Sequence, residues 1–512
     1  MVLQDKEERR TPDASGEGAQ DAPAANRAAP FLATTLDSAR ARLLFGFAAF
    51  SAWVNLLVCF EGFLRDTVIY GGGVVHDPFF IAAMVVGGIA LIVLSQASPR
   101  IASESEARSL ALCVLGCVAG GGGAVLSAVA TSASPGLAVA SATLGAACGI
   151  FIAHGTLRWG LIITSFDIRE MVFVLCAALC LQWVPFIADT AFGAPGKIAL
   201  AVLLPLISWW GQRGLREAIG AAEQPQAATG GSSADLTRIV ARVGSALFCF
   251  AFAVEFVWAS NVLMTDTPLE QTLFWLVYVF VLGASTAVMI FILRLMERWG
   301  AYRMELFYRA AFAFGVAGSA ALPLALNHLF FSYAVIYVAY ALICATMWML
   351  AWSVVFMRHG PARRVVGIVF GLQSLALPCG FAAAKLMRAL LGGTVAAAGA
   401  LPYVSFAAII VLVAAYAFLL PERTLLLLSP RLLKLSHESL DERCREVAAR
   451  YGLTERETEI FTLLARGRDV GYIEKELFIS RNTVNTHRKN LYRKLGIHTQ
   501  QELLSLIEDS LS

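Results

Sequence analysis

The stretch LFISRNTVNTHRKNLYRKLG, residues 477–496, decides how the end of this 512-residue chain folds. It carries five arginine or lysine side chains and no acidic one. Ser480 is suited to cap a helix from Arg481 to Leu495, and Gly496 is suited to end it in the left-handed conformation. The stretch therefore predicts a polar, basic helix in a chain that is 58% hydrophobic.

A capped helix is predicted further upstream. In LTERETEIFTLLARG, residues 453–467, Thr454 is followed three residues later by Glu457, which is the spacing of a capping box. Gly467 is expected to end this helix. The segment thus predicts a first helix of a small soluble domain.

A second, shorter helix is predicted in DVGYIEKELFIS, with Ile473, Leu477 and Phe478 facing inward. Apolar residues at helical spacing extend the expected core to Ile460, Leu464, Val484, Leu491 and Leu495. A fourth helix is expected in TQQELLSLIEDSLS. Two short helices before a basic third one indicate helix-turn-helix geometry.

Single residues in this helix-turn-helix region follow a specific pattern of spacing. The pattern consists of Leu453-Thr454, Arg456-Glu457, Gly467, Ile473, Leu477, Ile479-Ser480, Thr483-Val484, His487, Asn490 and Lys494-Leu495-Gly496. In this pattern the last 70 or so residues resemble the DNA-binding domain of LuxR-type transcription regulators. A basic stripe attracted to anionic lipid is the alternative, but it would require neither the Ser480 cap nor the Thr-Val-x-x-His register.

The resemblance implies double-stranded DNA as partner and assigns roles on the third helix. Base edges would be read by Asn485, Thr486 and Lys489, and backbone or mixed contacts would come from Arg481, Asn482, Thr483, Arg488 and Arg493. The family commonly has lysine where Asn485 stands, so a preference for adenine is expected here. The resemblance also implies a homodimer on DNA, with a dimer surface around Leu503, Leu504 and Ile507.

Long uncharged runs precede this domain, and each is close to the ~20 apolar residues that cross a bilayer. The expected spans are 43–62, 78–98, 109–133, 136–160, 170–190 and 196–212, then 241–264, 270–293, 306–327, 329–357, 365–390 and 400–420. Arginine and lysine cluster on one side of the alternating connections. The four on the other side are Arg65, Lys197, Lys385 and Arg388. We therefore expect a multi-pass protein of the inner (cytoplasmic) membrane with both termini in the cytoplasm.

The two sets of six spans show a faint likeness to each other. ARLLFGFAAFSAWVN, residues 41–55, and ARVGSALFCFAFAVE, residues 241–255, place Asn55 and Glu255 at matching depth. This six-plus-six architecture resembles the major facilitator superfamily, whose binding site lies between the halves. The loop SQASPRIASESEAR lacks the Gly-x-x-x-Asp-Arg-x-Gly-Arg-Arg signature of that superfamily, which counts against working transport.

Polar and aromatic residues within the spans are candidates for ligand sensing. Glu255 is the foremost, because an ionisable group deep in a span is costly and commonly functional. The equally weighted alternative is a structural, protonated Glu255 bonded to a neighbouring helix or to Asn55. The other candidates are Trp258, Trp348, Trp352 and Gln373.

The predicted fold is all-α: a twelve-span bundle followed by a small four-helix DNA-binding domain of helix-turn-helix type. The expected divisions are a disordered cytoplasmic tail (1–40), a first membrane half (41–213), a cytoplasmic linker (214–240), a second half (241–420), a juxtamembrane connector (421–439) and the DNA-binding domain (440–512). No nucleophile–base pair, phosphate-binding loop or Cys-x-x-Cys is present, so we expect no enzyme, cofactor or metal site.

These features together predict a one-component transcription regulator that senses an unknown small molecule through the bundle and binds DNA on the cytoplasmic side. Two alternatives stay open at this point. One is a transporter with an attached regulatory domain. The other is a passive membrane anchor from which proteolysis releases a transcription factor.

Overall fold

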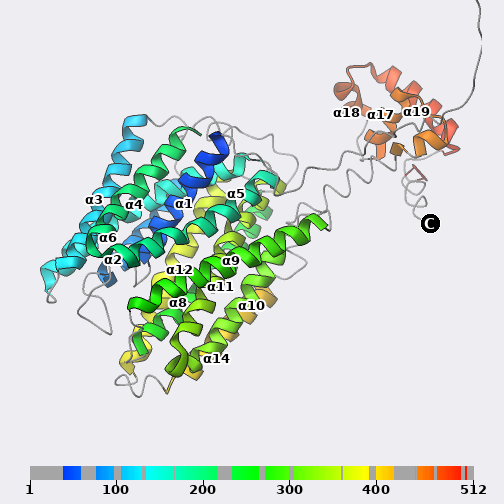
Figure 1. Ribbon diagram of the computed structural model, residues 1–512. Helices are drawn as coiled ribbons and strands as arrows, with labels where there is room; N and C mark the ends of the chain where they lie inside the picture. Colours follow the sequence, from blue (N-terminus) through cyan, green and yellow to red (C-terminus); the bar gives the residue numbers. More distant parts are fainter. Residues whose placement is uncertain are drawn as a thin grey trace, which may run out of the picture.

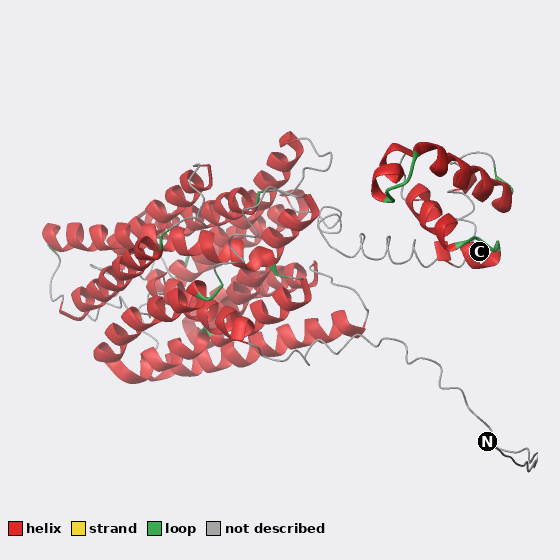
Figure 2. Ribbon diagram, turned by 90° about the horizontal axis from the view of Figure 1, so that it is seen from above, coloured by secondary structure: helices red, strands yellow, loops and turns green. Residues whose placement is uncertain are grey.

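The computed structural model describes residues 38–58, 76–96, 105–129, 134–166, 168–215, 233–264, 271–298, 305–358, 361–390, 399–419, 444–445, 447–465, 470–497 and 502–503. Within these ranges every regular element is a helix (Figure 2). The predicted all-α fold is therefore confirmed for the part of the chain that is described.

The membrane bundle consists of long helices that run alongside one another (Figure 1). Its first half contains α1 (Ser38–Val58), α2 (His76–Gln96), α3 (Glu106–Val129), α4 (Pro135–Ser165), α5 (Ile168–Leu181) and α6 (Trp183–Arg213). Its second half contains α8 (Ser233–Met264), α9 (Gln271–Arg298), α10 (Glu305–Ala321), η3 (Leu322–Leu324), α11 (Ala325–Arg358), α12 (Ala362–Leu390), α14 (Leu401–Ala414) and the π-helical turn η4 (Ala415–Leu419).

Each predicted span overlaps one of these helices. Ten described segments are long and apolar enough to cross a membrane by length and composition, and none of the ten lies in α1 or α10. Helix α10 has 17 residues, which is short for a ~30 Å hydrocarbon core at ~1.5 Å per residue. The bundle is thus multi-pass, and the count of twelve crossings stays a prediction.

The two halves meet where glycine lets backbones touch. Helix α12 packs against α8 in its own half and against α2 in the other. A Cβ added to Gly367 would lie 2.7 Å from the Leu91 carbonyl oxygen, and one added to Gly371 would lie 3.0 Å from that of Gly88. No side chain fits in these gaps, so the Gly367-x-x-x-Gly371 pair fixes a close α2–α12 contact.

Helix α6 shows how the bundle satisfies backbone groups in lipid. It departs from helical geometry at Gly193 (φ 60°, ψ −160°) and contains Pro205, which has no N–H to donate to the carbonyl of Ala201 four residues earlier. The indole Nε1 of Trp53 on α1 donates to that carbonyl at 2.8 Å. The sixth predicted span therefore tolerates its proline because a neighbouring helix supplies the missing donor.

Replacing Trp53 by phenylalanine should destabilise the bundle by about 2 kcal/mol, because the Ala201 carbonyl then stays buried without a donor. In a Pro205→Ala background the helix regains its own N–H, so the same replacement should cost distinctly less. Thermal unfolding of the four proteins in a double-mutant cycle measures the difference. Equal costs in both backgrounds would contradict this role for Trp53.

The C-terminal domain has a core of its own. Its helices include α17 (Glu455–Ala465), α18 (Val470–Glu476) and α19 (Arg481–Leu495), drawn in orange to red in Figure 1. Residues 444–445, 447–450 and 502–503 are also helical. Their shared core includes Cys444, Val447, Ile460, Phe461, Leu464, Ile473, Val484, Leu491, Leu495 and Leu503. The core residues expected from the sequence in α17 and α19 are all confirmed.

Candidate functional site

The basic helix α19 begins and ends where the sequence predicts. Ser480 is extended (φ −68°, ψ 152°), and its Oγ accepts a hydrogen bond from the Thr483 backbone N–H. Gly496 takes the left-handed conformation (φ 69°), and its N–H donates to the Tyr492 carbonyl. Both ends of α19 are thus fixed by local sequence.

The predicted capping box of α17 is confirmed. The backbone N–H of Thr454 donates to Glu457 Oε2 at 2.9 Å, and the backbone N–H of Glu457 donates to Thr454 Oγ1 at 3.3 Å. The predicted end of α17 at Gly467 lies outside the described residues.

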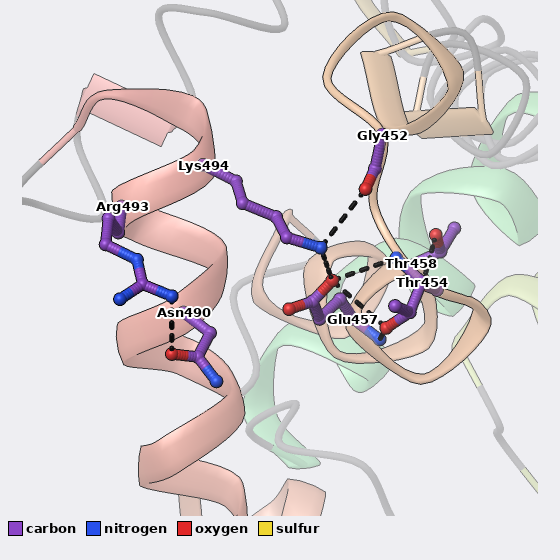
Figure 3. Close-up of polar contacts among 7 residues, drawn as sticks. All are labelled: Gly452, Thr454, Glu457, Thr458, Asn490, Arg493 and Lys494. Atoms are coloured by element: carbon purple, nitrogen blue, oxygen red, sulfur yellow. Dashed lines mark hydrogen bonds and ion pairs between the residues drawn. The ribbon is translucent and has the colours of Figure 1, made fainter.

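Glu457 also holds α17 against α19. Lys494 Nζ lies 2.6 Å from Glu457 Oε2 and donates to the Gly452 carbonyl at 3.1 Å (Figure 3). The Glu457 side chain is 6% exposed. Burial raises the pKa of Glu457, but the hydrogen bonds from Lys494 and Thr454 outweigh it and hold that pKa below the ordinary value. Lys494 is therefore a structural residue of the domain.

The opposite face of α19 is open to solvent. Arg481, Asn482, Thr483, Thr486, Lys489 and Arg493 are exposed, and Asn485 and Arg488 are partly exposed. Arg481, Asn485, Lys489 and Arg493 follow one another at four-residue intervals, so they form one row along the helix. Asn485, Arg488, Lys489 and Arg493 also line one concave surface of the domain. All eight predicted DNA contacts thus lie on one helix whose buried side is Val484, Leu491 and Leu495.

Not every exposed polar group of α19 is available. Thr486 Oγ1 donates to the Asn482 backbone carbonyl at 2.9 Å, and Arg493 donates to the Asn490 side chain at 3.4 Å (Figure 3). A threonine hydroxyl that donates to its own helix can still accept a hydrogen bond. Asn485 and Lys489 lie at the centre of the exposed row.

Two expectations for this domain are wrong. Phe478, expected to face inward, is 94% exposed. It lies in the turn between α18 and α19 with φ 53°, a left-handed conformation that directs its side chain away from the core. Leu503, expected on a dimer surface, is fully buried in the core of its own domain. The other two expected dimer residues, Leu504 and Ile507, lie outside the described residues.

The membrane bundle contains a cavity of about 70 Å³ between its halves. Its walls come from α1, α2 and α4 on one side and from α11 and α12 on the other. Three of the six predicted ligand-sensing residues line it, namely Asn55, Trp348 and Gln373. This cavity is the candidate ligand site of the membrane domain.

Asn55 is the centre of a polar network that joins the halves. Its Nδ2 donates to Gln182 Oε1 at 2.8 Å, and its Oδ1 accepts from the Tyr340 hydroxyl at 2.8 Å. Ser51 Oγ also donates to Gln182 Oε1, at 2.5 Å. The two ends of the Asn55 amide are thus bonded to Gln182 and Tyr340, and not to Glu255 as the sequence left open.

The other three candidates lie outside the cavity walls. Glu255 is buried at the contact of α8 with α12, where a Cβ added to Gly380 would lie 3.0 Å from the Glu255 Cβ. Trp258 Nε1 donates to the Tyr337 hydroxyl at 3.2 Å, and Trp352 Nε1 donates to the Phe166 carbonyl at 3.2 Å. Matching depth in two helices did not bring Glu255 to the cavity, because it faces a neighbouring helix.

Sequence inspection missed several polar groups. Gln182 and Tyr340 complete the Asn55 network, and Thr156 lines the cavity. At one end of the bundle, Asp77 on α2 forms an ion pair with Lys385 on α12 and lies 3.3 Å from His76 Nδ1. The sequence signal for that pair was a lone lysine within an apolar span opposite an aspartate at the start of another.

Replacing Lys494 by methionine should destabilise the C-terminal domain by about 2 kcal/mol, because it leaves the buried Glu457 carboxylate without its cation. Replacing the neighbouring Arg493 by methionine should leave stability nearly unchanged, because that side chain is exposed. Urea unfolding of the fragment Ser436–Ser512 followed by circular dichroism compares the two. Similar losses in both variants would contradict the structural role of Lys494.

Acid should weaken the domain through Glu457. Because its folded pKa is lowered, its contribution to stability is present above the unfolded pKa of ~4.3 and disappears as the pH falls through the folded value. The fragment with Glu457→Gln should lack this part of the acid loss. The free energy of unfolding of both proteins, measured at neutral pH and down to about pH 3, provides the test. If the free energies of unfolding of the two proteins fell in parallel with decreasing pH, this role of Glu457 would be contradicted.

The C-terminal domain matches a known family. Residues 452–507 match the family model described as GerE, bacterial regulatory proteins, luxR family. Over 71 residues the chain is 39% identical to an uncharacterized response regulatory protein of Escherichia coli, YgeK, which covers 13% of this chain and 48% of that protein. Over 45 residues it is 47% identical to the spore germination protein GerE of Bacillus subtilis, which covers 9% of this chain and 61% of that protein.

Solved structures similar to the membrane part have low sequence identity. The fucose:proton symporter FucP of Escherichia coli is 13% identical, with 74% of this chain and 98% of that one covered and a TM-score of 0.46. The xylose transporter XylE of Escherichia coli is 14% identical, with 75% and 97% covered and a TM-score of 0.47. The C-terminal residues of this chain therefore form a LuxR-type helix-turn-helix domain, carried by a protein with multiple transmembrane helices.

Proposed function

We propose that this chain is a membrane-embedded, one-component transcription regulator in which a small molecule bound between the halves of the bundle changes DNA binding by the C-terminal domain. The observation that carries the proposal is the exposed, acid-free face of α19 in a chain whose described residues include ten helices suited to cross a membrane. One chain thus joins a DNA-binding surface to a bilayer.

The electrostatics of α19 favour DNA. No carboxylate lies within the helix, and its one lysine that meets a carboxylate, Lys494, is held on the inner side by Glu457. Arg481, Arg488, Lys489 and Arg493 are left on the outer side, where they would neutralise phosphates and so release counterions from the duplex. The α19 helix would enter the major groove as the third helix of a helix-turn-helix.

The proposed contacts divide by side-chain type. Asn485 can pair with adenine N6 and N7, and Lys489 can donate to guanine, so these two side chains would specify sequence together with Thr486. Arg481, Asn482, Thr483, Arg488 and Arg493 would contact the backbone or make mixed contacts, which position the domain without reading sequence. A pair of domains on a two-fold site would require a homodimer.

The sensing step rests on the cavity between the halves. A ligand that prefers one arrangement of the bundle shifts the population toward it, in proportion to its differential affinity. The connector, residues 421–439, would carry that shift to the C-terminal domain. The excess of arginine and lysine on one side of the connections supports an orientation with both termini in the cytoplasm, where DNA is accessible.

Capture of fragmented genomic DNA by Ser436–Ser512 tests the DNA-binding step. We expect sequence-selective enrichment, lost when Asn485→Ala and Lys489→Ala are combined, because both proposed base contacts are then absent. Arg488→Ala is the matched control. It should weaken binding evenly across sequences and lower the slope of log affinity against log salt by about 1.

Weak, salt-sensitive binding shared by the wild type and the double variant would overturn sequence recognition by α19. The full-length protein in lipid nanodiscs should enrich the same sites. If only a fragment released from the membrane does so, the bundle would be an anchor rather than a sensor.

A further inference from the structure

The walls of the inter-half cavity specify what it can hold. Its hydroxyl and amide side chains are Ser51, Asn55, Thr156, Tyr340, Gln373 and Ser374, and the other lining residues are apolar. None of these described residues is an aspartate, glutamate, lysine, arginine or histidine. A charged ligand would leave water without gaining a counter-charge, which is unfavourable. The walls therefore favour an uncharged ligand.

Most polar groups of the walls already have partners. Tyr340 and Asn55 bond each other, Ser51 bonds Gln182, and Ser374 Oγ donates to the Phe370 carbonyl of its own helix at 2.8 Å. Thr156 and Gln373 make no side-chain hydrogen bond to any residue that the structure describes. Thr156 is 5% exposed, so it has little access to water elsewhere. These two side chains are the ones free to recognise a ligand.

The two free groups come from opposite halves, Thr156 from α4 and Gln373 from α12. Beside them runs an aromatic wall. The ring centroids of Phe47 and Trp348 are 5.0 Å apart with the rings at 86°, and those of Trp348 and Phe370 are 4.2 Å apart. These rings line the same cavity as Thr156 and Gln373, and a ligand bonded to both polar groups would join α4 to α12.

We propose that this cavity binds a small, uncharged, planar or cyclic molecule with a hydrogen-bond donor and an acceptor, held by Thr156 and Gln373 against the wall of Phe47, Trp348 and Phe370. The proposal rests on the proposed sensing function and names the ligand class for that site. A volume of about 70 Å³ holds roughly five water molecules, so a single five-membered ring matches the space. Glu255, buried against α12 outside the cavity, takes no part in recognition.

Three five-membered aromatic rings of equal size test this class. Pyrazole is neutral with one N–H donor and one ring acceptor, tetrazole is an anion at mildly acidic pH, and imidazole is then a cation. Each is titrated by calorimetry into the full-length protein in lipid nanodiscs. We expect pyrazole to bind and the tetrazolate and imidazolium ions to bind at least about tenfold more weakly, since neither ion meets a counter-charge.

Two variants locate the binding. Thr156→Val combined with Gln373→Leu should weaken pyrazole binding tenfold or more, because each lost hydrogen bond lowers the affinity by about a factor of ten. Thr143→Val is the matched control, since Thr143 lies exposed on the same α4 and donates to its own helix at 2.8 Å. Its affinity should equal that of the wild type. Glu255→Gln should likewise leave pyrazole binding unchanged.

No binding of pyrazole, equal or tighter binding of either ion, or full affinity in the Thr156 and Gln373 variant would overturn the proposal. DNA affinity of the same nanodiscs, measured with and without pyrazole, tests sensing separately. If pyrazole binds as expected and DNA affinity stays the same, the ligand class stands and the sensing function fails.

Discussion

A hydrocarbon interior offers no partner to a polar group, and this constraint shapes the whole membrane domain. The carbonyl that Pro205 leaves unpaired on α6 is bonded by Trp53 from α1, and the Asn55 amide is bonded by Gln182 and Tyr340. Each of these partners comes from a distant segment of the chain, so the hydrogen bonds help to determine which helices are neighbours. The same constraint points to a ligand in the cavity, because the side chains of Thr156 and Gln373 line it and have no hydrogen bond to a described residue.

The C-terminal domain distributes its charge differently. Helix α19 has five basic side chains, but Lys494 is bound to the buried Glu457, and this ion pair fixes α17 against α19. In the proposed function, stability and DNA binding therefore depend on opposite sides of one helix. A substitution on the inner side should act on folding, and one on the outer side on affinity, so mutational effects in this domain can be separated by two simple measurements.

Local patterns were sufficient for much of the fold. Ser480, Gly496 and the Thr454–Glu457 box depend on residues within one turn, and apolar runs depend on length alone, so the helices could be predicted from the sequence. Contacts between distant segments could not be predicted in this way. The pair Asp77–Lys385 joins residues 308 positions apart, and Leu503 was expected at a surface because an apolar face does not reveal whether its own domain covers it. The prediction that Phe478 faces inward was wrong for another reason. A left-handed backbone at a non-glycine residue cannot be recognised from the pattern of apolar residues.

The end of the last span bears on how a change in the bundle reaches the connector. Arg242 on α8 donates to the Phe418 carbonyl at 3.3 Å, and Tyr416 stacks on Tyr308 and Phe312 of α10. The π-helical turn η4 is therefore held by two other helices of the second half, immediately before residue 420. In turn, α8 packs against α12, which carries Gln373. A ligand that drew Gln373 toward Thr156 would move α12 relative to α4. The packing of α12 on α8 and of α8 on η4 would then carry that movement to the end of the last described helix, next to the connector.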